Sequence, residues 1–450
     1  MDGFNENSNE QQAQQPMGCL HRFSKTIKVV IIGLLILLLM IPMFMIENLI
    51  SERGRTQEEA IDEVSEKWSL AQTITGPYLN LQYPVVTENN GEKKVSIKDL
   101  ILFPDELMVN GQLKTEILKR SIYEVNVYQS ELTLKGSFSS EELKKSRIDM
   151  EQLQFDRAAI CLNLTDMRGI SEQISITLGD SVYIFEPGMD NRGIANTGVH
   201  AIANLSELKQ NKKLPYEIKI KLKGSQSLNF IPLGKTTRVD LKANWNTPSF
   251  TGNYLPNNRN ITEKEFSAQW QVLNLNRNYS QVMVDYNTSN IKDIENSSFG
   301  VNFKIPVEQY QQSMRSAKYA ILIILLTFGV IFFTEIMNKT RIHALQYLLV
   351  GLALCLFYSL LLSFSEHIGF NPAYLLSSAL TIILVGGYMF GITKKKKPSL
   401  IMSGLLGILY LYIFVLIQLE TFALLAGSLG LLIILAMVMY FSKKIDWFNE

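Results

Sequence analysis

Residues 29–46 have the sequence VVIIGLLILLLMIPMFMI, an apolar run that follows Arg22, Lys25 and Lys28. A helix needs about 20 apolar residues to cross a bilayer, and this run nearly supplies them. A cleaved signal peptide is the rival interpretation, but it would end in small residues, whereas Met45-Ile46 leads directly into Glu47. The run therefore predicts an uncleaved membrane anchor at residues 29–50.

Five further apolar runs occupy the C-terminal third, at about residues 319–337, 345–364, 372–392, 400–417 and 422–441. Basic residues occur in every second connection, at Lys339 and Arg341, at residues 394–397, and at Lys443 and Lys444. The intervening connections, residues 365–371 and 418–421, contain neither lysine nor arginine. With six spans, every basic cluster falls on the same side of the membrane. Because basic loops stay in the cytoplasm, this arrangement predicts that both termini are cytoplasmic and that the middle section is exported.

The middle section begins with a helical pattern at residues 51–72, in which Ile61, Val64, Trp68 and Ala71 form one apolar stripe. Gly76-Pro77 is expected to end this helix. We interpret the stripe as a face that packs on the following domain, in preference to a coiled coil that binds a partner.

Beyond residue 77 the apolar pattern has a period of two. This alternation is typical of strands with one buried and one wet face, and it predicts antiparallel sheets. The expected fold is a membrane α-helical bundle plus an all-β or α+β periplasmic domain that is sandwich-like. The alternation is clearest at residues 123–127, 174–178, 216–223, 239–245 and 301–305.

These patterns divide the chain into five parts. They are a disordered cytoplasmic tail at 1–28, the anchor at 29–50, a periplasmic β-rich domain with an N-terminal stalk helix at 51–318, a five-helix membrane domain at 319–441, and a cytoplasmic tail at 442–450. Whether the periplasmic part is one domain or two stays open.

Composition and motifs exclude several function classes. The net charge of +1 gives no reason to expect nucleic acid as a partner. The three cysteines, Cys19, Cys161 and Cys355, fall in three different parts of the chain, so no disulfide framework is expected. The sequence contains no metal-ligand spacing of histidines, no nucleophile elbow and no dinucleotide fingerprint, so we predict no cofactor, no metal and no catalytic residue.

Two charged groups are candidate functional residues. Asp166 and Arg168 form a compact charged turn, which is either a recognition site or, by our preferred interpretation, a structural ion pair. Glu366 and His367 lie at the outward end of the second C-terminal helix, where ionisable side chains often mark function. The alternative is that they are hydrated or cap the helix.

Several segments resemble the cell envelope integrity protein CreD family, whose members are also described as inner-membrane proteins linked to colicin tolerance. The resemblance covers nearly everything from the first span to the C-terminus. It is strongest at residues 343–353 and 361–367, and further landmarks are residues 166–170, 232–234, 245–252 and 444–448.

The resemblance implies an inner-membrane protein with a role in envelope integrity or stress, connected in some members with the response to β-lactams, and it supplies no reaction. Our working hypothesis is a non-enzymatic protein whose periplasmic domain binds an envelope protein or a cell-wall component, with membrane lipids around its helices. A lipid-handling protein or small-molecule transporter is the alternative, and it predicts that Glu366 or His367 lines a cavity. An enzyme acting on peptidoglycan or lipid is the third hypothesis.

Overall fold

The computed structural model describes residues 24–89, 92–146, 148–189, 194–195, 197–210, 212–284, 288–303, 305, 308–338, 341–419 and 422–443. The chain divides into two compact units. We call Met1–Thr56 with Val307–Glu450 the membrane unit, and Gln57–Pro306 the β unit. Cys19 and most of the two predicted tails lie outside the described residues.

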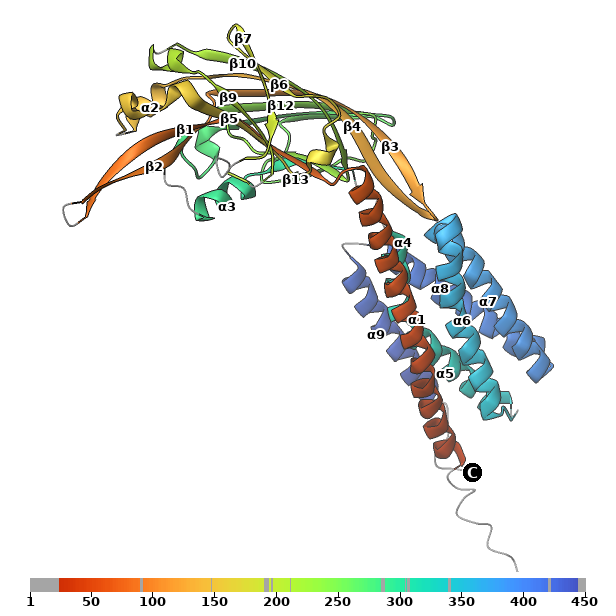
Figure 1. The fold of residues 1–450 in the computed structure, drawn as a ribbon. Coiled ribbons are helices and arrows are strands. Elements are labelled where there is room, and N and C mark those ends of the chain that lie inside the picture. Colours follow the sequence, from red (N-terminus) through yellow and green to blue (C-terminus); the bar gives the residue numbers. More distant parts are fainter. Residues whose placement is uncertain are drawn as a thin grey trace, which may run out of the picture. The chain divides into compact units, whose positions relative to one another are not determined.

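Helix α1 (Ser24–Trp68) is a single helix of 45 residues that begins in the membrane unit and ends in the β unit (Figure 1). At 1.5 Å per residue it is about 68 Å long. The prediction that Gly76-Pro77 ends this helix is wrong, because α1 ends at Trp68 and these two residues lie inside strand β1 (Gln72–Asn89). There they accompany a shift in the register between β1 and β5 (Ala158–Leu164), located between Thr75 and Tyr78.

In its described residues, the membrane unit contains six further helices, whose arrangement Figure 1 shows. Among the described residues, α1 and four C-terminal helices are long and apolar enough to cross a membrane, and α9 adds the shorter apolar stretch Leu425–Met437. The predicted combination of an N-terminal apolar helix with a C-terminal block of apolar helices is confirmed. The six are α4 (Glu308–Lys318), α5 (Ala320–Asn338), α6 (Ala344–Ile368), α7 (Phe370–Thr393), α8 (Lys396–Gln418) and α9 (Ala423–Ser442).

One face of α1 packs into the membrane unit. Its buried side chains recur every three or four residues, which places them on one side of a helix. Leu39 lies against Gly351 on α6, where even a Cβ atom would come within 2.2 Å of the leucine. Small residues at such positions allow membrane helices to approach closely. The buried stripe consists of Leu35, Leu39, Met43, Ile46 and Ile50.

The β unit is built from two mixed sheets. The nine-stranded sheet has the order β13-β17-β11-β1-β5-β9-β8, with β2 beside β1 and β16 beside β2. Its remaining strands are β2 (Glu92–Leu102), β8 (Glu186–Pro187), β9 (Val199–Ala203), β11 (Ser227–Phe230), β13 (Ser249–Gly252), β16 (Val282–Val284) and β17 (Phe299–Asn302).

The eight-stranded sheet has the order β14-β15-β12-β3-β4-β10-β6-β7. Its strands are β3 (Glu106–Arg120), β4 (Tyr123–Phe138), β6 (Ser175–Leu178), β7 (Ser181–Ile184), β10 (Leu214–Ser225), β12 (Thr236–Ala243), β14 (Asn258–Ile261) and β15 (Phe266–Leu273).

The β-rich fold is confirmed, but the sheets are not purely antiparallel as expected. Strand β1 pairs with β11 in parallel, and so does β3 with β12. Both pairs join strands that are far apart in the sequence, which a local periodicity does not reveal. Alternate residues of both sheets fill one shared core, for example Leu81 and Ile160 from one sheet and Leu132 and Ile218 from the other.

The nine-stranded sheet also has a second, smaller core on its other face. Strand β5 is buried along its whole length because Ile160 and Leu162 enter the main core, whereas Cys161 enters the smaller one. Helix α3 (Thr288–Asn296) contributes Ile294 to this smaller core. The arrangement places the ends of β1 and β5 beside α3, where a polar cavity lies.

Short helices complete the β unit: α2 (Glu141–Lys145), η1 (Met150–Gln152), η2 (Phe155–Arg157), η3 (Met167–Gly169), η4 (Ser206–Gln210) and η5 (Asn274–Asn276).

Candidate functional site

The charged turn predicted at Asp166 and Arg168 lies where α1 ends. Strand β5 stops at Leu164, and Asp166 is the N-cap of η3, with its carboxylate accepting a hydrogen bond of 3.0 Å from the Arg168 backbone N–H. Oδ2 of Asp166 also accepts bonds from the Leu70 N–H (2.9 Å) and the Ser69 hydroxyl (3.3 Å). The turn therefore holds the segment that connects α1 to β1.

Arg168 completes this junction with its guanidinium group. Its Nε lies 2.9 Å from Oδ1 of Asp166, its Nη2 lies 2.9 Å from Oδ2, and its Nη1 donates to the backbone oxygen of Glu66 at 2.6 Å. Burial raises the pKa of Asp166, but the hydrogen bonds from Arg168 and Leu70 and the positive charge of Arg168 outweigh it and lower the pKa to about 2. The carboxylate is therefore charged at any physiological pH.

Asp166 and Arg168 lie in one charged turn, as the sequence predicted. Their contacts are those of a structural ion pair. Position 169, occupied by glycine, has no room for a side chain, since a Cβ atom there would lie 2.3 Å from the Lys223 backbone oxygen. Neither Asp166 nor Arg168 is among the residues that line the two cavities described below.

The second predicted pair, Glu366 and His367, lies in the last turn of α6. The Glu366 carboxylate accepts a hydrogen bond of 3.0 Å from the Tyr310 hydroxyl on α4, and the Arg53 Nε on α1 is 3.9 Å away. The His367 side chain is exposed. Glu366 thus connects three helices of the membrane unit. The lipid-handling hypothesis predicted that Glu366 or His367 lines a cavity, but neither is among the residues that line the two cavities described below.

Sequence reasoning missed a polar cluster around Glu335, which lies near the C-terminal end of α5. Its side chain is 12% exposed and pairs with Lys28 of α1. It also accepts hydrogen bonds from the Ile342 N–H (3.2 Å) and the Tyr347 hydroxyl (3.2 Å), and Lys28 donates to the Ile342 backbone oxygen at 3.0 Å. The only signal in the sequence was one acidic residue at the end of an apolar run.

A polar cavity of about 270 Å³ lies in the β unit. Thr73 and Thr75 of β1 contribute to its wall, together with Asn163 of β5 and Glu295 of α3. The Asn163 amide is held in place by hydrogen bonds to the Tyr78 hydroxyl (2.7 Å) and to the Thr197 backbone oxygen (2.8 Å). The cavity therefore combines fixed backbone geometry with several hydroxyl groups, an arrangement suited to hydrogen-bonding a polar ligand.

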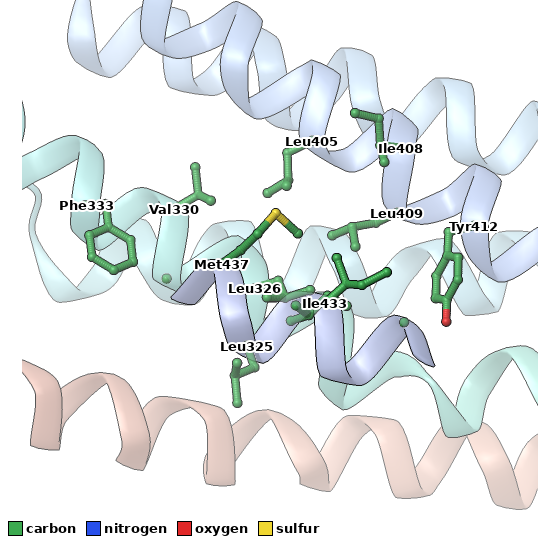
Figure 2. A pocket seen from close by; sticks show the side chains of 13 residues that line it. Leu325, Leu326, Val330, Phe333, Leu405, Ile408, Leu409, Tyr412, Ile433 and Met437 are labelled. Atoms are coloured by element: carbon green, nitrogen blue, oxygen red, sulfur yellow. The ribbon is translucent and has the colours of Figure 1, made fainter. Parts of the chain in front are cut away.

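An apolar cavity of about 350 Å³ lies in the membrane unit, between α5, α8 and α9 (Figure 2). Phe333 and Val330 line it from α5, Leu409 from α8, and Ile433 and Met437 from α9.

Comparison with known proteins identifies the family. Residues 24–448 match the family model described as Inner membrane protein CreD. This chain belongs to the CreD family. It is also similar to the Inner membrane protein CreD of Escherichia coli (strain K12), with 32% identity over 420 residues that make up 92% of this chain and 91% of that protein.

The match to the CreD family spans both units, so it includes both cavities and every candidate residue. Among the residues that the structure describes, no three histidine, cysteine or acidic side chains are placed to hold a metal ion. Cys161 and Cys355 are buried thiols that lie in different units and are not joined in a disulfide.

Proposed function

We propose that this protein supports the integrity of the cell envelope, without catalysing a reaction, by holding its β unit in the periplasm, where that unit binds an envelope protein or a cell-wall component. Colicin tolerance and the response to β-lactams are the expected phenotypes. The observation that carries the proposal is the polar cavity at the ends of β1 and β5, within a unit that is bracketed in the sequence by membrane helices.

The chemistry of the cavity supports binding. Threonine hydroxyls and an asparagine amide donate and accept hydrogen bonds at neutral pH. Among the described residues that line the wall, Glu295 is the only one with an ionisable side chain. A ligand rich in hydroxyl and amide groups, as cell-wall glycans and peptides are, would match this lining.

The distribution of basic residues supports the proposed orientation. Arg341, Lys397 and Lys443 follow or precede membrane helices at ends that six spans place on one side. Because lysine and arginine are enriched in cytoplasmic loops, that side is the cytoplasm and the β unit is periplasmic. A reporter active only in the periplasm, fused near residue 200 in the full chain, should be active, and activity of a cytoplasmic reporter there would overturn the orientation.

The ligand is best sought by crosslinking in living cells. A photoreactive amino acid at Thr197, which is exposed at the mouth of the cavity, should capture a discrete envelope component. The matched control is Arg259, an exposed residue of β14 that is remote from the cavity lining. Equal capture at both positions would argue against binding at the cavity.

A complementation test connects the cavity to the phenotype. Deleting the gene should increase sensitivity to detergent, colicin or β-lactam under envelope stress, and the wild-type gene should restore resistance. The Thr75→Val variant keeps the side-chain shape but removes a hydroxyl from the cavity wall, so it should restore resistance only partly. Unchanged resistance in the deletion strain would remove the basis for the proposal.

A second candidate function, lipid handling or small-molecule transport, has one supporting observation, the apolar cavity between α5, α8 and α9. The residues expected to line such a cavity, Glu366 and His367, are not among the residues that line this one, and Glu366 accepts a hydrogen bond from Tyr310 instead. If alanine at both positions left transport of a lipid or small molecule intact, their proposed part in this function would be excluded.

A further inference from the structure

Among the described residues that line the cavity between α5, α8 and α9, none has a free polar side chain. Of the residues that line it, only Tyr412 has a polar side-chain atom, and that hydroxyl donates a hydrogen bond of 2.9 Å to the Ala426 backbone oxygen. An apolar cavity offers water no hydrogen-bond partners and stays dry unless an apolar molecule fills it. The occupant must therefore be hydrocarbon.

The size of the cavity restricts the shape of that hydrocarbon. A helix with its side chains is about 10–12 Å across, so a volume of about 350 Å³ cannot admit one. An apolar cavity of about 150 Å³ holds benzene, so this one has room for a longer, thin chain. A second copy of this protein could not insert a helix here, whereas a single acyl chain fits.

The cavity lies among helices that lipid acyl chains would surround. Helices α5 and α8, which form two of its walls, have the length and composition of membrane-spanning segments. The surrounding medium at that depth is the acyl chains of lipids. We propose that this cavity is a binding site for one acyl chain of an anionic phospholipid.

Charge at one end of the cavity points to an anionic headgroup. The lining residues nearest the C-terminal ends of α5 and α9 are Phe333 and Met437, and Leu405 is the one nearest the N-terminal end of α8. Basic residues follow at the same three helix ends: Arg341, Lys443 and Lys396, all exposed. Lys443 comes six residues after Met437, about 9 Å along a helix, which reaches from the hydrocarbon into the headgroup layer.

Two glycines help to form the space, and they are not equivalent as test positions. A Cβ atom added at Gly430 would come within 1.8 Å of the Tyr412 hydroxyl oxygen, so a substitution there also disturbs α8. A Cβ atom added at Gly329 would meet nothing within 4 Å. Gly329→Leu therefore begins its side chain in open space and should reduce the cavity volume. The inference concerns a site in the membrane unit and does not depend on the function proposed for the β unit.

The test is photolabelling of the full chain in proteoliposomes with phosphatidylglycerol that carries a diazirine at mid-chain. Labels should concentrate on peptides from α5, α8 and α9. Gly329→Leu should lower this labelling at least fivefold. Gly387→Leu, at an exposed α7 glycine that also has open space, is the matched control and should leave labelling within twofold of the wild type.

Competition identifies the headgroup. Unlabelled phosphatidylglycerol should reduce labelling more than unlabelled phosphatidylethanolamine, and Lys443→Gln should narrow that difference. Labelling spread evenly over all lipid-facing helices, unchanged labelling in Gly329→Leu, or equal competition by both lipids would overturn the proposal. If Gly329→Leu fails to accumulate in the membrane, Ile433→Phe reduces the same space from α9. The same loss of labelling is then expected, and unchanged labelling would again overturn the proposal.

Discussion

Arg168 donates a hydrogen bond of 2.6 Å from its Nη1 to the backbone oxygen of Glu66. In a continuing helix that oxygen would accept from the N–H of Leu70, four residues later. The Leu70 N–H instead donates to Asp166, which is itself paired with Arg168. Arg168 and Asp166 thus bind the acceptor and the donor that would form the next hydrogen bond of the helix. Helix α1 ends at Trp68 because these two backbone groups are already satisfied.

Removing Arg168 should loosen this junction. In Arg168→Ala, the Glu66 oxygen loses its partner and the buried Asp166 carboxylate loses its counter-charge. We expect local destabilisation, because the Asp166 carboxylate is only 7% exposed and is left there without a counter-charge. Hydrogen exchange of peptides covering residues 60–75 should become faster.

Arg168→Lys should recover part of the protection, since lysine keeps the charge but not the planar fork of donors. The matched control is Lys221→Ala, which breaks an exposed ion pair with Glu172 and should leave the exchange rates nearly unchanged. Equal exchange in Arg168→Ala and Lys221→Ala would show that the junction does not depend on the pair.

The stability of the junction should depend on pH through Asp166. Its pKa is about 2 in the folded protein against an ordinary value of 3.8, so the folded state favours the charged form. This contribution is fully present above about pH 5 and is lost as the pH falls toward 2, and its upper size is about 2 kcal/mol. Protection of residues 60–75 from exchange, corrected for intrinsic rates, should therefore fall between pH 5 and pH 2.5.

Asp166→Asn is the control for this pH dependence. The variant should be less protected at pH 6 and should lose less protection on acidification than the wild type does. A parallel decline of both proteins would assign the acid sensitivity to other carboxylates.

The sequence predicted those elements whose physical constraint is local. The run at residues 29–46 is apolar because a bilayer surrounds it, and β10 and β12 alternate because one face of each is wet. Strand β5 escaped detection because both of its faces are buried, so Ala158–Leu164 shows no alternation. The parallel pairing of β1 with β11 depends on segments that are remote in the chain.

The same contrast between local patterns and contacts between remote segments applies to the candidate sites. Asp166 and Arg168 are two residues apart, so their pairing was visible, whereas the bonds to Leu70 and Glu66 cross about 100 residues and were not. Lys28 and Glu335 are separated by 307 residues, which no local pattern connects. Both cavities are formed by several elements at once, and composition alone does not locate them.

The contact between Leu39 and Gly351 should fix how α1 packs in the membrane unit. Gly351→Leu places atoms where the Leu39 side chain lies, and overpacking of this kind costs about 1–3 kcal/mol. Adding Leu39→Ala should restore part of the loss, because the smaller side chain frees the space. The midpoint of thermal unfolding of the full chain in detergent measures both effects.

Gly387→Leu is the control for this pair, since a side chain there meets open space. The two substitutions at 39 and 351 should be coupled, with an interaction energy of at least about 0.5 kcal/mol. Strictly additive losses would mean that α1 and α6 do not approach each other in the way described.

The cluster of Lys28 and Glu335 predicts an asymmetry between two single substitutions. Glu335→Ala deprives the Lys28 ammonium, the Tyr347 hydroxyl and the Ile342 N–H of their shared acceptor, so we expect a loss of about 2–4 kcal/mol. Lys28→Ala leaves the carboxylate with its two other donors and should cost about 1–2 kcal/mol.

The double variant that exchanges the two charges, Lys28→Glu with Glu335→Lys, should unfold at a higher temperature than Lys28→Glu alone. Thermal unfolding in detergent distinguishes these cases, with Lys135→Ala, which breaks an exposed ion pair to Glu217, as the control. Equal losses from Glu335→Ala and Lys28→Ala would contradict the central role given to the carboxylate.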